Sequence, residues 1–303
     1  MSDSLLIIGT GALACLFAAR LADAGVRVTL LGTWPEGLKA LRQHGVRLVE
    51  ADGRERAFPV RAIADPAGCA GACFALVLVK SWQTERAARQ LAQCLAPDGL
   101  ALTLQNGLGN RETLARALGA PRVALGVTTT GATLLGPGRV RPAGEGIISL
   151  GTHPRLGPLA DLLRRAGFAV EIMPGTDDLL WSKLVVNAAI NPLTALLRVP
   201  NGELLARPAA RTLMAAAAHE AATVAAAIGM HLTYPDPVAA AEDVARRTAA
   251  NRSSMLQDVE RGAPTEIETI CGAVAQAGEQ SGVPTPVNRT LWLLIKALAE
   301  KGE

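Results

Sequence analysis

The chain has 303 residues, half of them apolar and 19% charged, which is typical of a soluble globular protein of about two domains. A net charge of +3, with scattered basic residues, excludes a strongly basic nucleic-acid-binding protein and gives no sign of a membrane-binding surface. The five cysteines and four histidines show no metal-ligand spacing, so we expect reduced thiols and no metal site. Residues 1–4 lead directly into a strand pattern, which predicts a cytoplasmic protein without a signal peptide.

The first segments follow the order of a dinucleotide-binding unit. A strand, a glycine turn, a helix and a second strand are expected at residues 5–8, 9–14, 12–24 and 26–31. The turn reads G-x-G-x-x-A, in which Gly9 allows the tight turn and Gly11 lets the backbone approach a pyrophosphate at the positive end of the helix. The alternative is a glycine turn without a ligand, but the surrounding strand and helix favour the nucleotide site.

Two continuous apolar runs, at residues 74–79 and 100–104, are typical of buried parallel strands. Lys80 follows the first run and Asn106 lies just after the second. Both residues should therefore lie at the carboxyl ends of strands, beside a nucleotide crevice. The alternatives are a solvated loop lysine and an ordinary Asn-Gly turn.

The pattern changes after these runs. Residues 123–150 are rich in β-branched residues and glycine and predict β-hairpin structure covering one edge of the sheet, and 168–172 predict a last strand. A Pro-Gly break follows, and only helical periodicity is found beyond it. The predicted fold class is α/β, with an N-terminal Rossmann-type domain at residues 1–174 followed by an all-α domain at 175–303. The cleft expected between two such domains is the default ligand site.

The most informative helical segment covers residues 181–201. Lys183, Asn187 and Asn191 recur every four residues and so share one stripe of an otherwise apolar helix. A surface helix with a solvated polar face is the alternative, but the other faces are too apolar for it. A buried ammonium and buried amides predict a wet site that binds a small polar ligand. Pro192 should kink this helix or free a carbonyl.

Two later segments carry further candidates. Residues 251–258 are helical in pattern and offer small hydroxyls and an amide that could hold a carboxylate. Residues 262–268 predict a helix start with a proline near its first position. Glutamates in a first turn commonly serve the helix dipole, and one of Glu266 and Glu268 is expected to do only that.

Taken together, the motifs resemble those of the ketopantoate reductase (2-dehydropantoate 2-reductase) family over nearly the whole chain. They are GTGALA at 9–14, KSWQ at 80–83, QNGLG at 105–109, TTT at 128–130, WSKLVVNAAINPLT at 181–194, PNGEL at 200–204, SSMLQD at 253–258 and PTEIE at 264–268. The resemblance implies an NADPH-dependent reduction of 2-dehydropantoate to pantoate, on the route to pantothenate and coenzyme A, without a metal. By analogy, a homodimer is possible.

The resemblance also assigns roles to residues. Lys183 would be the proton donor, and Glu266 would lie near the nicotinamide and the substrate. The residues implied to bind substrate are Asn106, Asn187, Asn191, Asn201, Asn251 and Ser254. The residues implied to bind the cofactor NADP are Gly9, Thr10, Gly11, Ala12, Leu13, Ala14, Thr33, Lys80, Asn106, Thr133 and Glu266.

One position departs from the family pattern. Thr33 stands where the family often places an arginine for the 2′-phosphate of NADPH, and no Asp or Glu is present there to accept the ribose hydroxyls of NAD. Lys80, with Lys39 or Arg42 on the next helix, could supply positive charge, so a modest preference for NADPH is expected. The alternatives are a related reductase of another 2-oxo acid and a nucleotide-binding sensor without chemistry. The set of Lys183, Asn187, Ser254 and Glu266 argues against the sensor.

Overall fold

The computed structural model describes residues 4–300, which form two compact units. Unit 1 holds the residues up to 105 together with 110–176, and unit 2 holds 106–109 together with 177 onwards. The expectation that no signal peptide is present rests on residues 1–4, of which 1–3 lie outside the described residues.

The larger sheet of unit 1 has eight strands in the order β12-β11-β8-β7-β6-β1-β2-β5. Its strands are β1 (Ser4–Ile8), β2 (Arg27–Leu31), β5 (Arg61–Ile63), β6 (Ala72–Val77), β7 (Leu95–Thr103), β8 (Val123–Thr128), β11 (Ile147–Gly151) and β12 (Ala169–Met173). Neighbouring strands are parallel except for β8 and β11, which are antiparallel. The predicted α/β class and the strands after the glycine turn are therefore confirmed.

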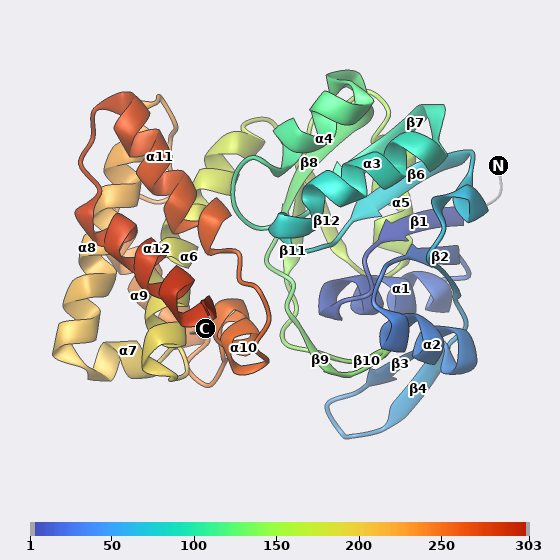
Figure 1. Cartoon of the computed structure of the whole chain (residues 1–303), viewed down its shortest axis with the longest axis horizontal. Helices are drawn as coiled ribbons and strands as arrows, with labels where there is room; N and C mark the ends of the chain where they lie inside the picture. Colours follow the sequence, from blue (N-terminus) through green and yellow to red (C-terminus); the bar gives the residue numbers. More distant parts are fainter. Residues whose placement is uncertain (1–3, 301–303) are drawn as a thin grey trace. The chain divides into compact units, whose positions relative to one another are not determined.

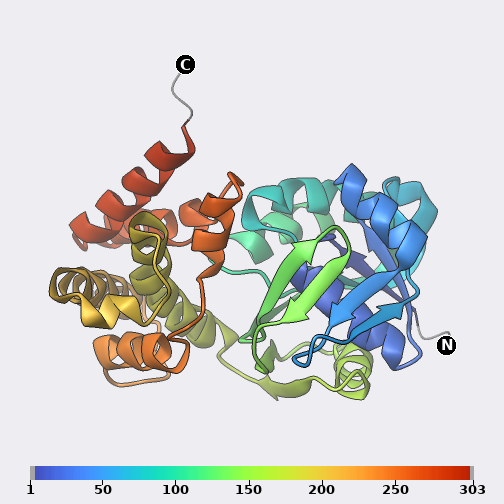
Figure 2. The same cartoon turned by 90° about the horizontal axis from the view of Figure 1, so that it is seen from below.

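The prediction that residues 123–150 form hairpin structure over a sheet edge is wrong in part. β8 and β11 lie inside the large sheet, and β12 is its edge. Every residue of β8 is buried, and its mainly apolar sequence from Val123 is typical of an interior strand. Only the central part forms a hairpin, and it belongs to a second sheet with the order β4-β3-β10-β9. The strands of this sheet are β3 (Val46–Val49), β4 (Glu55–Phe58), β9 (Ala132–Gly136) and β10 (Arg139–Pro142), visible as the blue and green ribbons of Figure 2.

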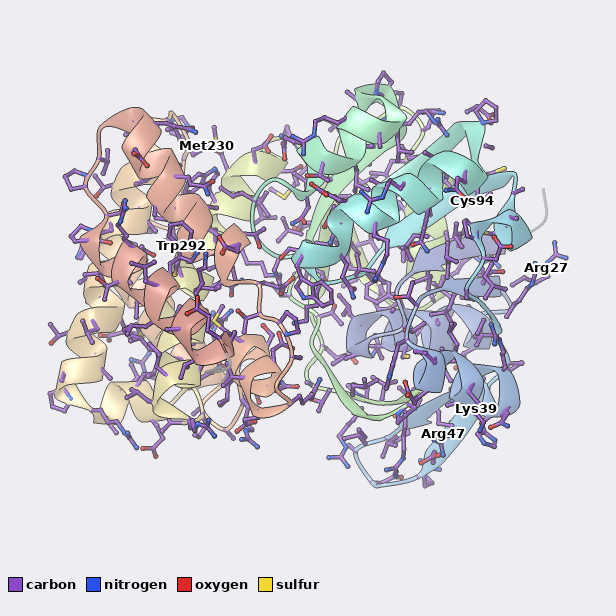
Figure 3. All side chains as sticks on the ribbon, viewed as in Figure 1. Arg27, Lys39, Arg47, Cys94, Met230 and Trp292 are labelled. Carbon is purple, nitrogen blue, oxygen red and sulfur yellow. The ribbon has the colours of Figure 1, made fainter. Side chains whose placement is uncertain are left out.

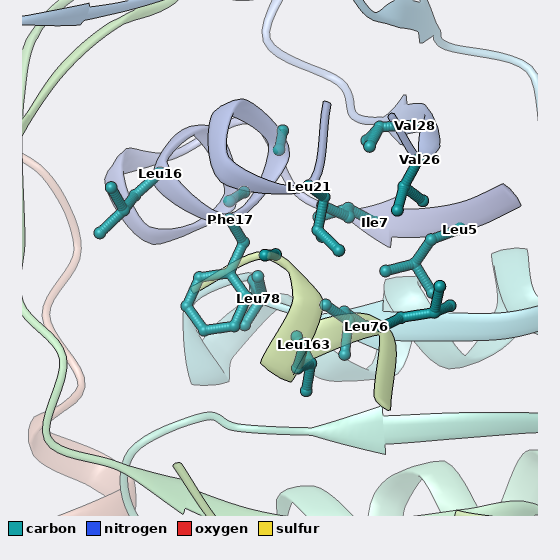
Figure 4. Packing of buried hydrophobic residues seen from close by; sticks show 14 of the residues in the cluster. Leu5, Ile7, Leu16, Phe17, Leu21, Val26, Val28, Leu76, Leu78 and Leu163 are labelled. Carbon is teal, nitrogen blue, oxygen red and sulfur yellow. The ribbon is translucent and has the colours of Figure 1, made fainter. Parts of the chain in front are cut away.

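Helices cover both faces of the large sheet (Figure 1). They are α1 (Ala12–Asp23), α2 (Pro35–His44), α3 (Thr84–Cys94), α4 (Asn110–Leu118) and α5 (Gly157–Arg165), with short 3-10 turns η1 (Pro66–Cys69), η2 (Ser81–Gln83) and η3 (Ala120–Arg122). Alternate residues of β1 face opposite layers, as the period of a strand requires. Leu5 and Ile7 pack with α1 and α5, whereas Leu6 and Ile8 pack with α3 and α4. Figure 4 shows Phe17 and Leu21 of α1 directed toward this core.

Unit 2 is helical throughout its described part, with no strand after residue 176, as predicted. Its elements are α6 (Thr176–Leu197), α7 (Glu203–Ala206), α8 (Pro208–Ala227), α9 (Pro237–Arg247), α10 (Ser254–Glu260), η4 (Ile267–Thr269), α11 (Cys271–Ser281) and α12 (Pro286–Ala299). Among the described helices, only α6 is long and apolar enough to qualify as a membrane-span candidate. Because 78% of its most apolar window is buried inside the protein, its composition is that of a core helix.

The helix α6 runs unbroken through Pro192. Proline lacks the N–H that would bond to the carbonyl four residues earlier, that of Ala188. The thiol of Cys271 donates to this carbonyl oxygen, with its sulfur 3.8 Å away. The expected freed carbonyl is thus present and is partnered by the first residue of α11.

The predicted helix start at residues 262–268 is wrong. The segment forms only the 3-10 turn η4, and α11 begins at Cys271. The break between η4 and α11 falls at Thr269, whose carbonyl accepts a hydrogen bond from the backbone N–H of Leu108, 3.0 Å away. The predicted helical run at 251–258 likewise begins later, at Ser254, with Ser253 as its N-cap.

Candidate active site

The glycine turn after β1 has the geometry of a site for an anion. Gly9 has φ = +127°, and a Cβ there would stand 3.0 Å from the carbonyl oxygen of Leu78, so a larger residue would be strained. Gly11 is the N-cap of α1, with no side-chain capping bond and no atom within 4 Å of the place a Cβ would occupy. The first turn of α1, Ala12 to Ala14, contains no acidic residue. Its N–H groups and helix dipole therefore fit a phosphate group.

The turn also lies where the strand order reverses. The chain passes from β1 to β2 on one side and returns later to β6 on the other. Loops that leave the carboxyl ends of β1 and β6 consequently diverge, and such a point is the usual nucleotide crevice of open α/β sheets. Lys80 follows β6 at this edge and is half-buried. Thr10 is buried, and its side chain packs against Gly32, where a Cβ would stand 2.6 Å from its methyl carbon.

The remaining cofactor candidates of unit 1 are more scattered. Thr33 is exposed just beyond β2, where the 2′-phosphate partner was expected. Lys39 is exposed on α2 and is labelled in Figure 3. Arg42 uses its Nε to donate to the carbonyl of Ala62, 2.8 Å away. Thr133 lies on β9 of the second sheet, opposite Arg141, rather than at the end of a strand of the large sheet.

In unit 2, Lys183 is joined to two other predicted site residues. Its Nζ donates to Asn106 Oδ1 over 2.8 Å, and Asn106 Nδ2 donates to Glu266 Oε2 over 3.3 Å. Glu266 is only 5% exposed. Burial lowers the pKa of Lys183 to about 8, whereas the charge of Glu266 acts to raise it. An ammonium with such a pKa can give up its proton near neutral pH.

The loop at residues 106–109 reaches this group through a close backbone approach. Gly107 has φ = +79°, and a Cβ there would stand 2.4 Å from Thr269 Oγ1. The backbone N–H of Leu108 donates to the Thr269 carbonyl and so holds the loop against the turn η4. Thr269 Oγ1 in turn donates to the carbonyl of Glu266 over 3.2 Å. Only glycine can be accommodated at position 107 at this distance from Thr269. This close contact positions the preceding residue, Asn106, beside Lys183.

The polar stripe of α6 continues from Lys183 to Asn187, which is half-buried, and Asn191, which is buried. The hydroxyl of Thr194, one turn later, lies 2.9 Å from the Asn191 carbonyl and donates to Ser253 Oγ over 2.7 Å. Ser253 also caps α10 by accepting from the N–H of Leu256. This pair connects α6 to the start of α10, where Ser254 is half-buried.

Sequence reasoning did not identify Thr194 and Ser253 as residues that hold the site together. The available signal was a serine directly before an apolar helical run, which is a common N-cap. A hydrogen bond between residues 59 positions apart has no such local pattern.

A second polar group lies at Asn201 and Asn251. The backbone N–H of Asn201 donates to the Asn251 carbonyl over 2.9 Å, and its Nδ2 donates to Thr248 Oγ1 over 2.8 Å. Asn201 is buried, and its Oδ1 has no hydrogen-bond partner, which is costly unless a ligand donor occupies the site. Asn251 itself is exposed.

Glu268 is separated from Glu266 by its contacts. It accepts from Trp292 Nε1 and from Lys296 Nζ, each over 2.9 Å, and so fastens η4 to α12, where Figure 3 labels Trp292. Within residues 4–300, no group of three or more His, Cys, Asp or Glu side chains is arranged to hold a metal ion.

Comparisons with known proteins agree with both units. Residues 5–155 match the family model for ketopantoate reductase PanE/ApbA, and residues 176–299 match the model for its C-terminal part. A 2-dehydropantoate 2-reductase of Halobacterium salinarum is 37% identical over 98% of this chain and 99% of its own length.

Solved structures show the same similarity. A PanE/ApbA family ketopantoate reductase from Ralstonia eutropha has a TM-score of 0.90 and 33% identity, with 98% of both chains covered. D-mandelate dehydrogenase, solved with NADH and anilino(oxo)acetate, has a TM-score of 0.92 and 26% identity at the same coverage. With the glycine turn in unit 1, the lysine group in unit 2 and both family models matched, the chain belongs to the ketopantoate reductase family.

Proposed function

We propose that the protein is a cytoplasmic enzyme that reduces 2-dehydropantoate to pantoate with NADPH, in the biosynthesis of pantothenate and coenzyme A. The observation that carries this proposal is the group of Lys183, Asn106 and Glu266, in which a half-buried lysine has a pKa of about 8. The Halobacterium salinarum relative is a 2-dehydropantoate 2-reductase, which supports the choice of substrate.

The two parts of the chain take different tasks in this proposal. Residues 1–174 bind the nucleotide through the turn at 9–14, with the pyrophosphate on the N-terminus of α1. Residues 175–303 bind the oxo acid, together with Asn106 from the loop that packs in unit 2. The uncapped N-terminus of α1 and the open space at Gly11 support this assignment.

The proposed chemistry follows from charge. When bound, the reduced nicotinamide supplies a hydride to the keto carbon, and negative charge develops on the keto oxygen. The Lys183 ammonium stabilises that oxygen and donates a proton to it, which leaves a neutral amine that takes a proton from solvent. Asn106 Oδ1 holds the ammonium in place, and Glu266 favours its protonated form. This scheme needs no metal ion.

Amides of α6 and of residues 201 and 251, with the hydroxyl at the start of α10, are proposed to hold the substrate. These residues are Asn187, Asn191, Asn201, Asn251 and Ser254. An amide N–H or a serine hydroxyl can donate to a carboxylate, and an amide oxygen can accept from the substrate hydroxyl. The unpartnered Oδ1 of Asn201 supports such a role, because a substrate hydroxyl would satisfy it.

A second candidate function is the reduction of another 2-oxo acid. This candidate is supported by the similarity to D-mandelate dehydrogenase, which shares the fold at a TM-score of 0.92 and was solved with anilino(oxo)acetate. The same neighbour was solved with NADH, so the second candidate could use NADH in place of NADPH.

We propose NADPH as the cofactor for two reasons. Position 33 holds a threonine and not an acidic residue that would repel the 2′-phosphate, and Lys80 can supply positive charge.

A panel assay tests the proposal. NADPH and NADH oxidation are followed with 2-dehydropantoate and with phenyl- and alkyl-substituted 2-oxo acids, and kcat/KM is compared. The highest value with 2-dehydropantoate and NADPH is expected. A higher value for another oxo acid selects the second candidate, and nucleotide binding without turnover of any member selects the non-catalytic sensor.

A further inference from the structure

Gln105, which directly precedes Asn106, has no role in the function proposed above. Its side chain is 7% exposed and lies in unit 1, at the end of β7. Its Nε2 donates to the carbonyl of Val79 over 3.0 Å and to Thr84 Oγ1 over 2.8 Å, and its Oε1 accepts from Thr103 Oγ1 over 3.0 Å. Both polar atoms of this buried amide are therefore used: Nε2 joins the end of β7 to the segment that follows β6, and Oε1 bonds back to the last residue of β7.

The bonds continue on the other side of Lys80. Thr84 is 2% exposed, and its hydroxyl lies 2.8 Å from the carbonyl oxygen of Ser81 and 2.8 Å from Asn110 Oδ1. The Lys80 carbonyl itself accepts from the N–H of Gln83, 2.8 Å away. The residues before and after Lys80 are thus fixed by bonds that lead back to one amide, that of Gln105.

We propose that Gln105 is a positioning residue for the nucleotide, which acts by holding the backbone of Lys80 at the carboxyl end of β6. This inference rests on the proposed function, because it assumes that Lys80 contacts a phosphate of the cofactor. A lysine stem is flexible, and its ammonium finds a phosphate with less loss of entropy when its backbone is fixed. The amide of Gln105 supplies that fixation from a neighbouring strand.

A purely structural role predicts something different. If the amide served only to satisfy the carbonyl of Val79, its loss would lower the melting temperature without a specific effect on the nucleotide. Ser149 offers a matched control, because it is also buried in unit 1, on β11, and its hydroxyl donates to Glu171 of β12 rather than to this network.

The test measures the Kd of NADPH by fluorescence titration, without oxo acid, in Gln105→Met, Thr84→Val, Thr84→Ser and Ser149→Ala. We expect Kd to rise about fivefold to tenfold in Gln105→Met and Thr84→Val, as the loss of a buried hydrogen bond would predict. Thr84→Ser keeps the hydroxyl and should bind like the wild type, as should Ser149→Ala. In a Lys80→Ala background, Gln105→Met should raise the Kd of NADPH by less than about twofold, because the effects of two coupled substitutions do not add.

Three results would overturn the inference: an unchanged Kd in a folded Gln105→Met or Thr84→Val variant, an equal loss in the Lys80→Ala background, or an equal loss in Ser149→Ala. If Gln105→Met does not fold, the comparison of Thr84→Val with Thr84→Ser decides. A wild-type protein that binds no nucleotide would refute the proposed function and the inference with it. A wild type that binds NADPH and reduces an oxo acid, with normal binding in the variants, would refute the inference alone.

Discussion

Lys183 Nζ and Asn106 Oδ1 lie 2.8 Å apart, although 77 positions separate the two residues in the chain. The asparagine accepts from the ammonium and in turn donates to Glu266. The lysine therefore has a fixed direction and a nearby negative charge, while burial lowers its pKa to about 8. The first two predictions concern this group.

Replacing Lys183 by alanine removes the proposed proton donor. We expect kcat to fall by about 10²- to 10⁴-fold, the usual contribution of general acid catalysis, while NADPH still binds. Lys296→Ala is the matched control, because that lysine is also half-buried in unit 2 but pairs with Glu268 instead of Asn106. Steady-state kinetics and a nucleotide titration check both statements, and near-normal turnover in Lys183→Ala would refute the assignment.

The pH dependence of reduction should report the same residue. Reduction needs the ammonium form of Lys183, so kcat/KM should decrease as the pH rises through about 8. Glu266 raises this pKa, so Glu266→Gln should move the decrease to lower pH. Glu268→Gln serves as the control and should leave the profile in place. A profile that is flat between pH 6 and about 9.5, well above the lysine pKa, would contradict the role of Lys183.

Two glycines of one loop should respond differently to alanine. Gly107 and Gly109 both have positive φ, but a Cβ at 107 would stand 2.4 Å from Thr269 Oγ1, whereas at 109 no atom lies within 4 Å. Gly109→Ala should cost only the conformational strain, about 1–2 kcal/mol of unfolding free energy. Gly107→Ala should cost more and should also lower kcat, because it displaces Asn106 from Lys183. Equal melting temperatures and equal kcat in the two variants would show that the contact with Thr269 does not matter.

Ser254→Ala should affect the oxo acid and not the nucleotide. Its hydroxyl is half-buried at the start of α10 and is proposed to donate to the substrate carboxylate. Loss of one charge-assisted hydrogen bond, about 1.5–3 kcal/mol, predicts a rise in KM for the oxo acid of roughly tenfold or more. Measuring KM for both substrates tests this, and a weakened affinity for NADPH instead would mean that the serine belongs to the cofactor site.

Cofactor preference should change at Thr33. The side chain is exposed beyond β2 and carries no charge, so the wild type should prefer NADPH over NADH only modestly. Thr33→Arg adds a charged partner for the 2′-phosphate and should widen the preference by roughly tenfold, whereas Lys80→Ala should narrow it. The ratio of kcat/KM values for the two nucleotides is the measurement. A wild-type preference for NADH would show that the phosphate partner has been placed wrongly.

The sequence predicted well those features that depend on local patterns. The turn at Gly9 and Gly11 and the apolar strands β6 and β7 follow from composition and periodicity, which reflect burial directly. The hairpin prediction for 123–150 is wrong in part because glycine and β-branched residues indicate strands but not the sheet to which each strand belongs. The pairing of β3 with β10 brings together segments about ninety residues apart, and no local signal specifies it.

The site shows the same division. Lys183, Asn187 and Asn191 were found because a polar stripe on an apolar helix is unusual. The bonds that hold this stripe, such as Thr194 to Ser253, depend on the packing of α6 against α10 and leave no pattern in either segment. The predicted helix start near Pro264 is wrong, because the chain there forms only the turn η4. The Thr269 carbonyl that ends this turn accepts from Leu108, a tertiary contact with no local pattern in the sequence.

The four residues 106–109 pack with unit 2 although the chain on either side of them belongs to unit 1. A single cut near residue 175 would therefore leave Asn106 on one fragment and Lys183 on the other. A C-terminal fragment made alone would keep its lysine but lose the amide that accepts from it, and the Thr269 carbonyl would lose its Leu108 donor. The acid–base behaviour of this lysine is thus a property of the uncut polypeptide and not of either half.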